Sequence, residues 1–387
     1  MRLLAVNNIE RPSLNIYDFA ATKEEMKIGI VCYPTFGGSG VLACELGLSL
    51  VKEHEVHFIS YACPARLETD NHRILYHRVD VPPYPLFEYS PYTLALASKI
   101  IDVIEHYHLD IIHVHYVIPH AASAYLAKKA LAAKIKIVTT LHGTDVHLLG
   151  VDPSYKPIVE FSMENSDSLT AVSEFLKKET REKFSITRPI TVIPNFVDPE
   201  KYQRATRGKE KIICHISNFR PLKRVADVVR IFGMIANKVN SKLYLIGEGP
   251  TKHPAQKLVK KLGLQEKVCF RGNVRDVSRI LGKTDLFLLP SEQESFGLAA
   301  LEAMSSEVPV VASRVGGLPE VIRHGKDGYL AEMGDLDTMA EYCLKILTDD
   351  SLAVKMGREA RKRVLEKFTT EKVVPQYVSL YRRTLSS

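Results

Sequence analysis

Residues 27–43 read KIGIVCYPTFGGSGVLA, an apolar run, a glycine-rich turn and the start of a helical pattern. The run Lys27–Tyr33 predicts a buried strand, and residues 41–53 have the spacing of a helix with one apolar face. The glycines at 38 and 40, with the alanine that follows them, match the dinucleotide-binding pattern G-x-G-x-x-G/A. The stretch therefore predicts the first strand–turn–helix unit of a parallel α/β sheet, and it leaves open what the turn binds.

A dinucleotide site also needs an acidic residue about 20 positions further on, at the end of the second strand. That strand is expected at residues 55–61, where Ser60 stands near the end and Glu55 at the beginning. A nicotinamide-dependent oxidoreductase is therefore disfavoured. Two interpretations remain: the turn holds another anion through its backbone N–H groups and the helix dipole, or it is a tight turn without a ligand.

The same alternation of strand, loop and helix continues along the chain. Further strands are expected at residues 111–115, 135–141, 168–172, 211–217, 242–246, 268–271, 285–290 and 308–313. Helices of 10 to 15 residues between strands are typical of a parallel sheet covered on both faces. The sequence predicts an α/β fold of two Rossmann-like domains that face each other across a cleft.

The turn-rich segment Pro194–Pro199 marks the expected boundary between these domains. We expect residues 26–197 to form the first domain and residues 198–369 the second, with a C-terminal helix, about residues 370–387, crossing back to the first. Residues 1–25 lack the apolar run of a signal peptide, and we interpret them as an extension outside the fold.

Composition limits the function classes. The 387 residues carry six cysteines without a C-x-x-C pair, which suits a reducing compartment such as the cytoplasm. The net charge of +7 comes from short basic groups at helical spacing, so we expect small anionic substrates and neither a nucleic acid nor a membrane as partner. The expected helix at 41–53 has Lys52 as its single cation, which argues against membrane docking. A homo-oligomer remains possible.

The second domain carries a charged constellation at predicted strand ends. Glu294 and Glu302 stand eight positions apart across a strand-to-helix turn, and the N–H groups of residues 296–298 are expected to be unpaired at the helix start. Arg220 and Lys223 follow another strand, where a guanidinium and an ammonium can clamp a diphosphate.

These motifs resemble those of the family 4 retaining glycosyltransferases, which have two Rossmann-like domains (the GT-B type). The resemblance covers about residues 26–385. It rests on Glu294-x7-Glu302, on the loop 37–40, on residues 141–145 (LHGTD), on residues 195–198 (NFVD), on residues 247–250 (GEGP) and on residues 316–320 (GGLPE). One position departs from the family: Asn218 stands where an arginine usually precedes the phosphate-binding lysine, so the division of the diphosphate among Asn218, Arg220 and Lys223 stays open.

The resemblance implies a set of site residues. As catalytic residues it implies Arg220, Lys223, Glu294 and His142, with Glu294 at the sugar hydroxyls and His142 near C6 of the sugar. For the UDP-sugar it implies Gly38, Asn218, Arg271, Val274, Ser295, Phe296, Gly297, Leu298 and Glu302, the last at the ribose. For the acceptor we expect Ser39, Gly40, Tyr116 and Thr140.

Residues 32–40, 112–120, 138–145 and 215–220 look most like the branch of the family that starts bacillithiol biosynthesis. That likeness implies UDP-N-acetylglucosamine as donor, L-malate as acceptor, and no metal or other cofactor. The alternatives are a family 4 enzyme with an inositol phosphate or lipid acceptor, a glycosidase that uses Glu294 and Glu302, and a non-catalytic nucleotide-sugar-binding protein.

Two patterns invite a metal site. His113, His115 and His120 lie close together in sequence, but no carboxylate or cysteine completes a recognisable ligand set. Asp335 and Asp337 imitate a D-x-D motif, yet they precede a helix, where aspartate is typical of the N-cap and first turn. We therefore expect no metal.

Overall fold

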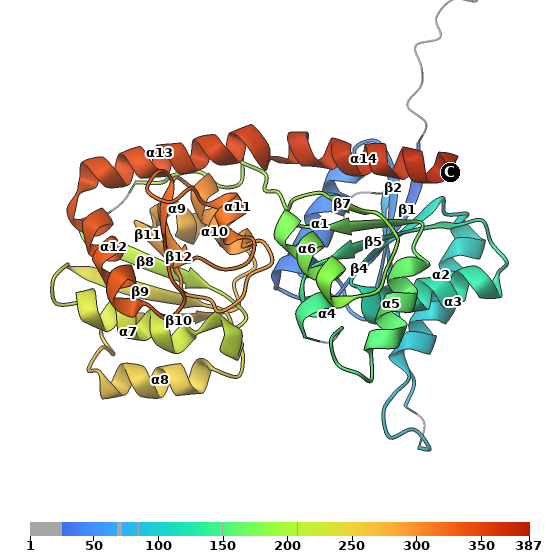
Figure 1. Cartoon of the computed structure of the whole chain (residues 1–387), viewed down its shortest axis with the longest axis horizontal. Coiled ribbons are helices and arrows are strands. Elements are labelled where there is room, and N and C mark those ends of the chain that lie inside the picture. Colours follow the sequence, from blue (N-terminus) through green and yellow to red (C-terminus); the bar gives the residue numbers. More distant parts are fainter. Residues whose placement is uncertain (1–24, 68–71, 84, 149, 207) are drawn as a thin grey trace, which may run out of the picture.

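The computed structural model describes residues 25–67, 72–83, 85–148, 150–206 and 208–387. The extension expected at residues 1–25 thus lies outside the described residues, apart from its last position. Two lobes lie side by side, each built on one parallel sheet with helices on its faces (Figure 1). The predicted α/β class with two Rossmann-like domains is confirmed.

The N lobe contains a seven-stranded sheet in the order β3-β2-β1-β4-β5-β6-β7. Its strands are β1 (Lys27–Val31), β2 (Glu55–Ser60), β3 (Ile74–Arg78), β4 (Ile111–His115), β5 (Lys136–Leu141), β6 (Ser168–Ala171) and β7 (Ile190–Val192). All neighbouring strands run parallel. Strand order reverses between β1 and β4, the place where ligands bind in such sheets.

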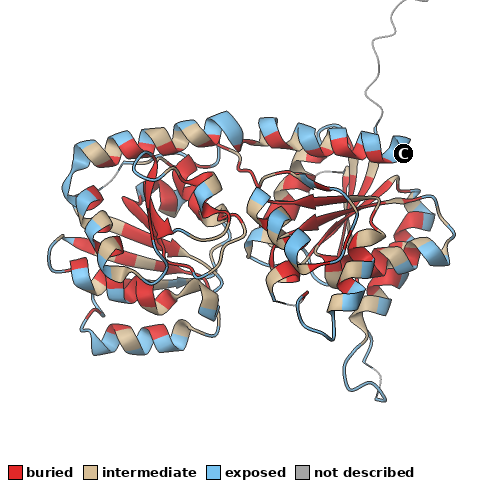
Figure 2. Cartoon of the chain, in the orientation of Figure 1, coloured by how far each residue is buried: buried red, intermediate tan, exposed pale blue. Residues whose placement is uncertain are grey.

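Helices cover both faces of this sheet, so the central strands β1 and β4 are buried almost throughout, and apolar residues dominate β1 while β4 also buries two histidines (Figure 2). The helices are α1 (Gly38–Leu50), α2 (Tyr92–Tyr107), the short π-helical turn η1 (Val117–Ala121), α3 (Ala122–Ala130), α4 (Thr144–His147), α5 (Lys156–Glu164) and α6 (Glu174–Lys183).

The C lobe repeats the arrangement with a six-stranded sheet in the order β10-β9-β8-β11-β12-β13. Its strands are β8 (Lys211–Ile216), β9 (Ser241–Ile246), β10 (Val268–Gly272), β11 (Leu286–Leu289), β12 (Val310–Ser313) and β13 (Gly328–Ala331). Its helices are η2 (Pro221–Lys223), α7 (Val225–Ile235), α8 (Lys252–Lys261), α9 (Ser278–Lys283), α10 (Leu298–Ser305), α11 (Leu318–Val321), α12 (Leu336–Thr348) and α13 (Asp350–Lys367). Here the strand order reverses between β8 and β11.

The last helix, α14 (Thr370–Ser386), leaves the C lobe and packs on the N lobe (Figure 1). Tyr377 and Tyr381 are fully buried there, against a core that includes residues of α1 and β1. The chain crosses between lobes twice at one place, because Val197 donates its N–H to the Phe368 carbonyl (2.9 Å) and Thr370 donates to the Val197 carbonyl (3.2 Å). The two crossings tie the lobes together at this point.

Some elements differ from the expectation. The strands β3, β7 and β13 were not predicted, and α1 begins at Gly38 rather than at Val41.

The six cysteines are free, and four of them are buried. Within the described ranges, no helix combines the length and apolar character needed to cross a membrane.

Candidate active site

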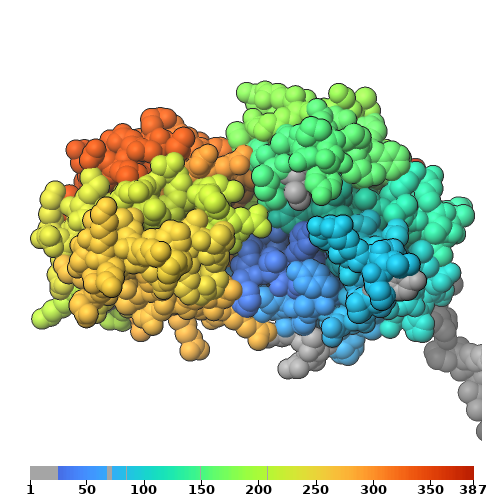
Figure 3. Space-filling model, turned by 90° about the horizontal axis from the view of Figure 1, so that it is seen from below, coloured from blue at the N-terminus to red at the C-terminus, as the bar shows by residue number. Residues whose placement is uncertain are grey.

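A cleft of about 810 Å³ lies between the lobes and is lined by residues of both. Its walls include the loops that follow β1, β4, β8 and β11, the strands on either side of the two order reversals, together with the loops after β2, β5, β9 and β10. Figure 3 shows the lobes in contact on one face, with early N-lobe residues in blue at the junction. Of the predicted site residues, the cleft is lined by Gly38, Ser39, Tyr116, His142, Asn218, Arg220, Lys223, Val274, Glu294, Ser295, Phe296, Gly297, Leu298 and Glu302.

On the N-lobe side, the glycine turn is the first turn of α1. The first helical bond runs from the Val41 N–H to the Gly37 carbonyl (3.1 Å), so the N–H groups of the three residues between them precede the ladder and are available to an anion. Gly40 is not among the residues that line the cleft, so its assignment to the acceptor stays a prediction that rests on its backbone N–H group. It is buried, and a Cβ there would lie 2.6 Å from the Tyr33 carbonyl oxygen, so its role is close packing of the turn.

Ser39 and Tyr116, two expected acceptor residues from different strand ends, meet in the cleft. The Ser39 hydroxyl donates to the Tyr116 hydroxyl at 3.1 Å. Burial raises the pKa of Tyr116, while hydrogen bonding and the positive charge of Arg220 in the other lobe act in the opposite direction. A neutral hydroxyl pair therefore faces a cation across the cleft.

Behind this pair lies a cluster of neutral histidines. His142 Nε2 lies 2.9 Å from His115 Nδ1, and the His113 ring nitrogens lie 2.7 Å from the hydroxyls of Tyr381 and Thr140. Burial lowers the pKa of His113 and of His142 to about 3, so both rings are uncharged near neutral pH.

Thr140 is fully buried, and its hydroxyl lies 2.7 Å from both the His113 ring and the Thr170 hydroxyl. The assignment of Thr140 to the acceptor was therefore wrong, because its hydroxyl is used inside the lobe.

In the described part of the chain, no group of three or more His, Cys, Asp or Glu side chains is placed to hold a metal ion. Asp335 is the N-cap of α12, as expected, and accepts the Thr338 N–H at 3.0 Å.

On the C-lobe side, the charged residues form pairs. Lys223 Nζ lies 2.6 Å from Glu294 Oε1, and the Ser291 hydroxyl donates to the same oxygen at 2.9 Å. Arg220 and Asn218 are exposed and border the cleft beside this pair. A paired ammonium thus stands at the end of β8 beside a guanidinium for which the described residues show no hydrogen bond or ion pair.

The turn before α10 directs backbone N–H groups into the same space. Gly297 has φ +98° and is the N-cap, and the first helical bond runs from the Leu301 N–H to the Gly297 carbonyl (3.0 Å). A Cβ on Gly316 would lie 1.8 Å from the Glu294 carbonyl oxygen, so the glycines 316–317 allow a second loop to support this turn. The start of α10 therefore presents N–H groups of the kind that bind anions, in the same cleft as Lys223.

Arg271 is not among the residues that line the cleft, and its assignment to the donor stays a prediction. Its guanidinium lies over the Tyr244 ring, 4.6 Å from the ring centroid, and its side chain is exposed. Val274 does line the cleft, together with its neighbours Asn273 and Val277.

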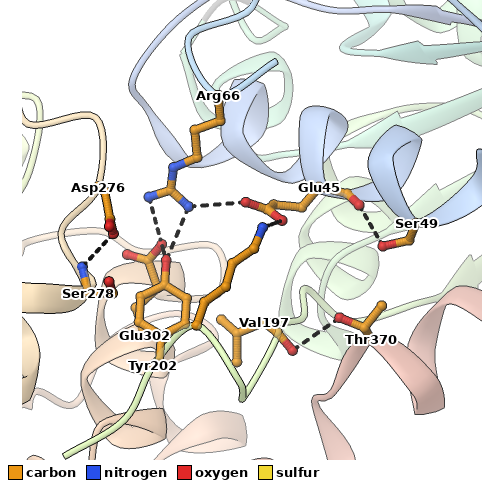
Figure 4. Close-up of polar contacts among 10 residues, drawn as sticks. Glu45, Ser49, Arg66, Val197, Tyr202, Asp276, Ser278, Glu302 and Thr370 are labelled. Atoms are coloured by element: carbon orange, nitrogen blue, oxygen red, sulfur yellow. Dashed lines mark hydrogen bonds and ion pairs between the residues drawn. The ribbon is translucent and has the colours of Figure 1, made fainter. Parts of the chain in front are cut away.

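Glu302 is buried on α10 and contacts two residues that the sequence did not point to. Its Oε1 accepts hydrogen bonds from Arg66 Nη2 (3.1 Å) and from the Tyr202 hydroxyl (2.6 Å), as Figure 4 shows. Arg66 and Asn195 also line the cleft. No motif marks Arg66, because a lone arginine in a loop is indistinguishable in sequence from a surface charge.

The lobes also touch beside the cleft. The Ser173 hydroxyl donates to the Ser295 carbonyl at 2.6 Å, and the Glu320 carboxylate accepts the N–H groups of Glu174 (3.0 Å) and Phe175 (2.7 Å) at the start of α6. These contacts bring the neutral N-lobe surface and the charged C-lobe surface together around one cleft.

Two Rossmann-like lobes that face each other across a cleft form the GT-B architecture, and the sequence comparisons show that the chain is a glycosyltransferase. The family model described as Glycosyltransferase Family 4 matches residues 36–201, and the model described as Glycosyl transferases group 1 matches residues 197–363. The chain belongs to the family 4 glycosyltransferases.

The chain is 47% identical over 368 residues to the N-acetyl-alpha-D-glucosaminyl L-malate synthase of Bacillus anthracis, covering 92% of this chain and 97% of that protein. Solved structures agree in fold. The sucrose-phosphate synthase of Thermosynechococcus elongatus has a TM-score of 0.80 at 20% identity and covers 94% of this chain and 100% of its own. HepE of Anabaena, solved with UDP and glucose, has a TM-score of 0.77 at 18% identity with the same coverage.

Proposed function

We propose that this chain transfers N-acetylglucosamine from UDP-N-acetylglucosamine to the hydroxyl group of L-malate with retention of configuration, as the first step of bacillithiol biosynthesis. The observation that carries the proposal is the 47% identity, over nearly the full length of both chains, to the synthase of Bacillus anthracis that is named for this product. The distribution of charge in the cleft supports it.

The donor diphosphate is assigned to the C lobe. Negative charge grows on the diphosphate as the glycosidic bond breaks, so donors that are already in place stabilise the transition state directly. Arg220, Lys223 and the N–H groups of residues 296–298 supply these donors. The 2.6 Å contact with Glu294 holds the ammonium of Lys223 in position before the substrate arrives.

The sugar and the ribose are assigned to carboxylates. Glu294 accepts hydrogen bonds from the sugar hydroxyls, and Glu302 accepts them from the ribose. His142 borders the sugar as a neutral hydrogen-bonding group, because desolvation lowers its pKa to about 3. The leaving phosphate oxygen takes the acceptor proton on the same face of the sugar, so the scheme needs no protein base.

The acceptor is assigned to the N lobe. A dicarboxylate can place one carboxylate at the N–H groups that begin α1, beside the hydroxyls of Ser39 and Tyr116, which lie 3.1 Å apart. Arg220 faces this surface from the other lobe. In this scheme the glycine turn binds the acid rather than a dinucleotide.

UDP release from UDP-N-acetylglucosamine, measured against a panel of hydroxy acids, inositol phosphate and lipids, tests the proposal. We expect release that depends on L-malate. Release of free N-acetylglucosamine regardless of malate would indicate a glycosidase, and tight UDP binding without turnover on any acceptor would indicate a non-catalytic sensor.

A further inference from the structure

An arginine of the N lobe reaches the carboxylate that we assign to the ribose. Arg66 follows β2, while Glu302 lies on α10 of the C lobe. Figure 4 shows the guanidinium directed at both Glu302 and Tyr202, and its Nη1 donates to the Tyr202 hydroxyl at 3.1 Å. Three side chains that are distant in sequence therefore form one hydrogen-bonded triad.

The triad uses one oxygen of the Glu302 carboxylate and leaves the second oxygen available to a ligand. Arg66 Nη2 and the Tyr202 hydroxyl both donate to Oε1 of Glu302, at 3.1 and 2.6 Å. Among the described residues, every side-chain hydrogen bond to this carboxylate ends on that oxygen. Because Glu302 lines the cleft, Oε2 remains for a ligand, and its direction is set by the two donors on Oε1.

Arg66 is itself held in place. Its Nη1 lies 3.6 Å from Glu45 Oε1 on α1, and Lys201 Nζ lies 2.7 Å from the other oxygen of Glu45. Arg275 of the C lobe donates to the carbonyl of Leu67 at 3.2 Å, so the loop that carries Arg66 is attached to both lobes. The side chain is only 16% exposed, and a guanidinium so well paired cannot be an ordinary surface charge.

We propose that Arg66 is a positioning residue for nucleotide recognition: it anchors Oε1 of Glu302 so that Oε2 accepts the hydroxyls of a nucleoside-diphosphate ribose. The inference rests on the proposed function of Glu302. Its consequence is that the ribose site is complete only when the N lobe lies against the C lobe. Nucleotide recognition and contact between the lobes are then linked through one side chain.

The test measures the affinity for UDP and for 2′,3′-dideoxy-UDP by calorimetry, in the wild type and in Arg66→Met, which keeps the length of the side chain and removes its charge. The wild type should bind UDP about 10-fold or more tightly than the dideoxy compound, since hydrogen bonds to a charged group are lost. In Arg66→Met we expect this ratio to fall toward one, with little change for the dideoxy compound. The KM for malate should stay unchanged.

Arg66→Lys, which retains a positive charge, should restore part of the ratio. Arg78→Met, a change at a 69% exposed arginine of the same lobe, should leave it unchanged. An unaltered ratio in Arg66→Met, or equal losses for both nucleotides, would overturn the inference while the proposed function stands. If the wild type bound both nucleotides equally, Glu302 would not bind the ribose and the inference would fail with that role. Malate-dependent turnover tests the proposed reaction separately.

Discussion

The two lobes repeat one strand order but bring opposite chemistry to the cleft. The loops after β1, β4 and β5 present backbone N–H groups, the hydroxyls of Ser39 and Tyr116, and the uncharged ring of His142. The loops after β8 and β11 present Lys223 paired with Glu294, and the exposed guanidinium of Arg220. The same topology therefore supports neutral groups at the loops after β1, β4 and β5 in one lobe and charged groups at the loops after β8 and β11 in the other.

The comparison shows that the strand order sets the position of each loop at the cleft, while the residues of the loop set its chemistry. In the proposed reaction the leaving diphosphate needs cations, and the C lobe has them at the strand ends beside its order reversal. A neutral acceptor hydroxyl with a nearby carboxylate needs amides and hydroxyls, which the N lobe supplies. Four measurements can break or sharpen this contrast.

The largest expected effect concerns the neutral histidines of the N lobe. Burial lowers the pKa of His113 and His142 to about 3 and that of His120 to about 4, whereas an unfolded chain titrates near 6.5. Below pH ~6.5 the unfolded state binds protons that the folded state does not, so stability present above this pH is lost as the pH falls toward 4. In this window each histidine lowers the free energy of unfolding by ~1.4 kcal/mol for each pH unit of acidification. The summed loss should reach several kcal/mol, and urea unfolding at a series of pH values measures it.

Asp145 provides the matched control for this profile. Burial raises its pKa to about 6, so its contribution has the opposite sign and grows as the pH falls from about 6 toward 4. Asp145→Asn removes this opposing contribution and should make the acid-side loss steeper. A free energy of unfolding that stays flat between neutral pH and about pH 5 would contradict the neutral cluster.

The next effect tests the charged surface. Lys223→Met should lower kcat on the order of 10²–10³-fold, because one fixed donor to the leaving diphosphate is lost. Lys223→Arg should recover part of the loss, and Lys257→Met on the exposed face of α8 should have no effect. Steady-state rates of UDP release measure all three. A kcat within about threefold of the wild type for Lys223→Met would remove the lysine from the reaction.

The sequence was sufficient for the arrangement of the sheets because buried apolar strands alternate with helices. The three missed strands, β3, β7 and β13, all lie at sheet edges. There a strand pairs on one side only and can be short or polar: β3 reads ILYHR and β7 has three residues.

For the site, local motifs pointed to residues that the structure places along the cleft, such as Ser39, Lys223 and Glu294. Contacts between distant loops could not be predicted in the same way. Arg66 and Glu302 stand 236 positions apart, and only the packing of the lobes brings them together. Thr140 failed for the converse reason: its strand-end position predicted exposure to the cleft, but its hydroxyl is taken by His113 and Thr170.

A smaller effect tests how the neutral surface is held. Tyr381→Phe removes the hydroxyl that lies 2.7 Å from His113 Nδ1 and leaves a fully buried ring nitrogen without that partner. We expect the free energy of unfolding to fall by about 1–3 kcal/mol. Tyr89→Phe, at a tyrosine that is 81% exposed, is the control and should cost nothing measurable. Equal stabilities of the two variants would mean that α14 contributes packing alone.

The smallest effect separates the two surfaces most directly. Ser39→Ala removes one neutral hydroxyl at the start of α1, and a single neutral hydrogen bond contributes about 0.5–1.5 kcal/mol. The KM for malate should therefore rise about 2- to 10-fold, while the KM for UDP-N-acetylglucosamine stays within error. Ser49→Ala is the matched control, because its hydroxyl bonds to the Glu45 carbonyl within the same helix. If Ser39→Ala raised both KM values equally, the glycine turn would serve the donor as well, and the division of acceptor and diphosphate between the lobes would fail.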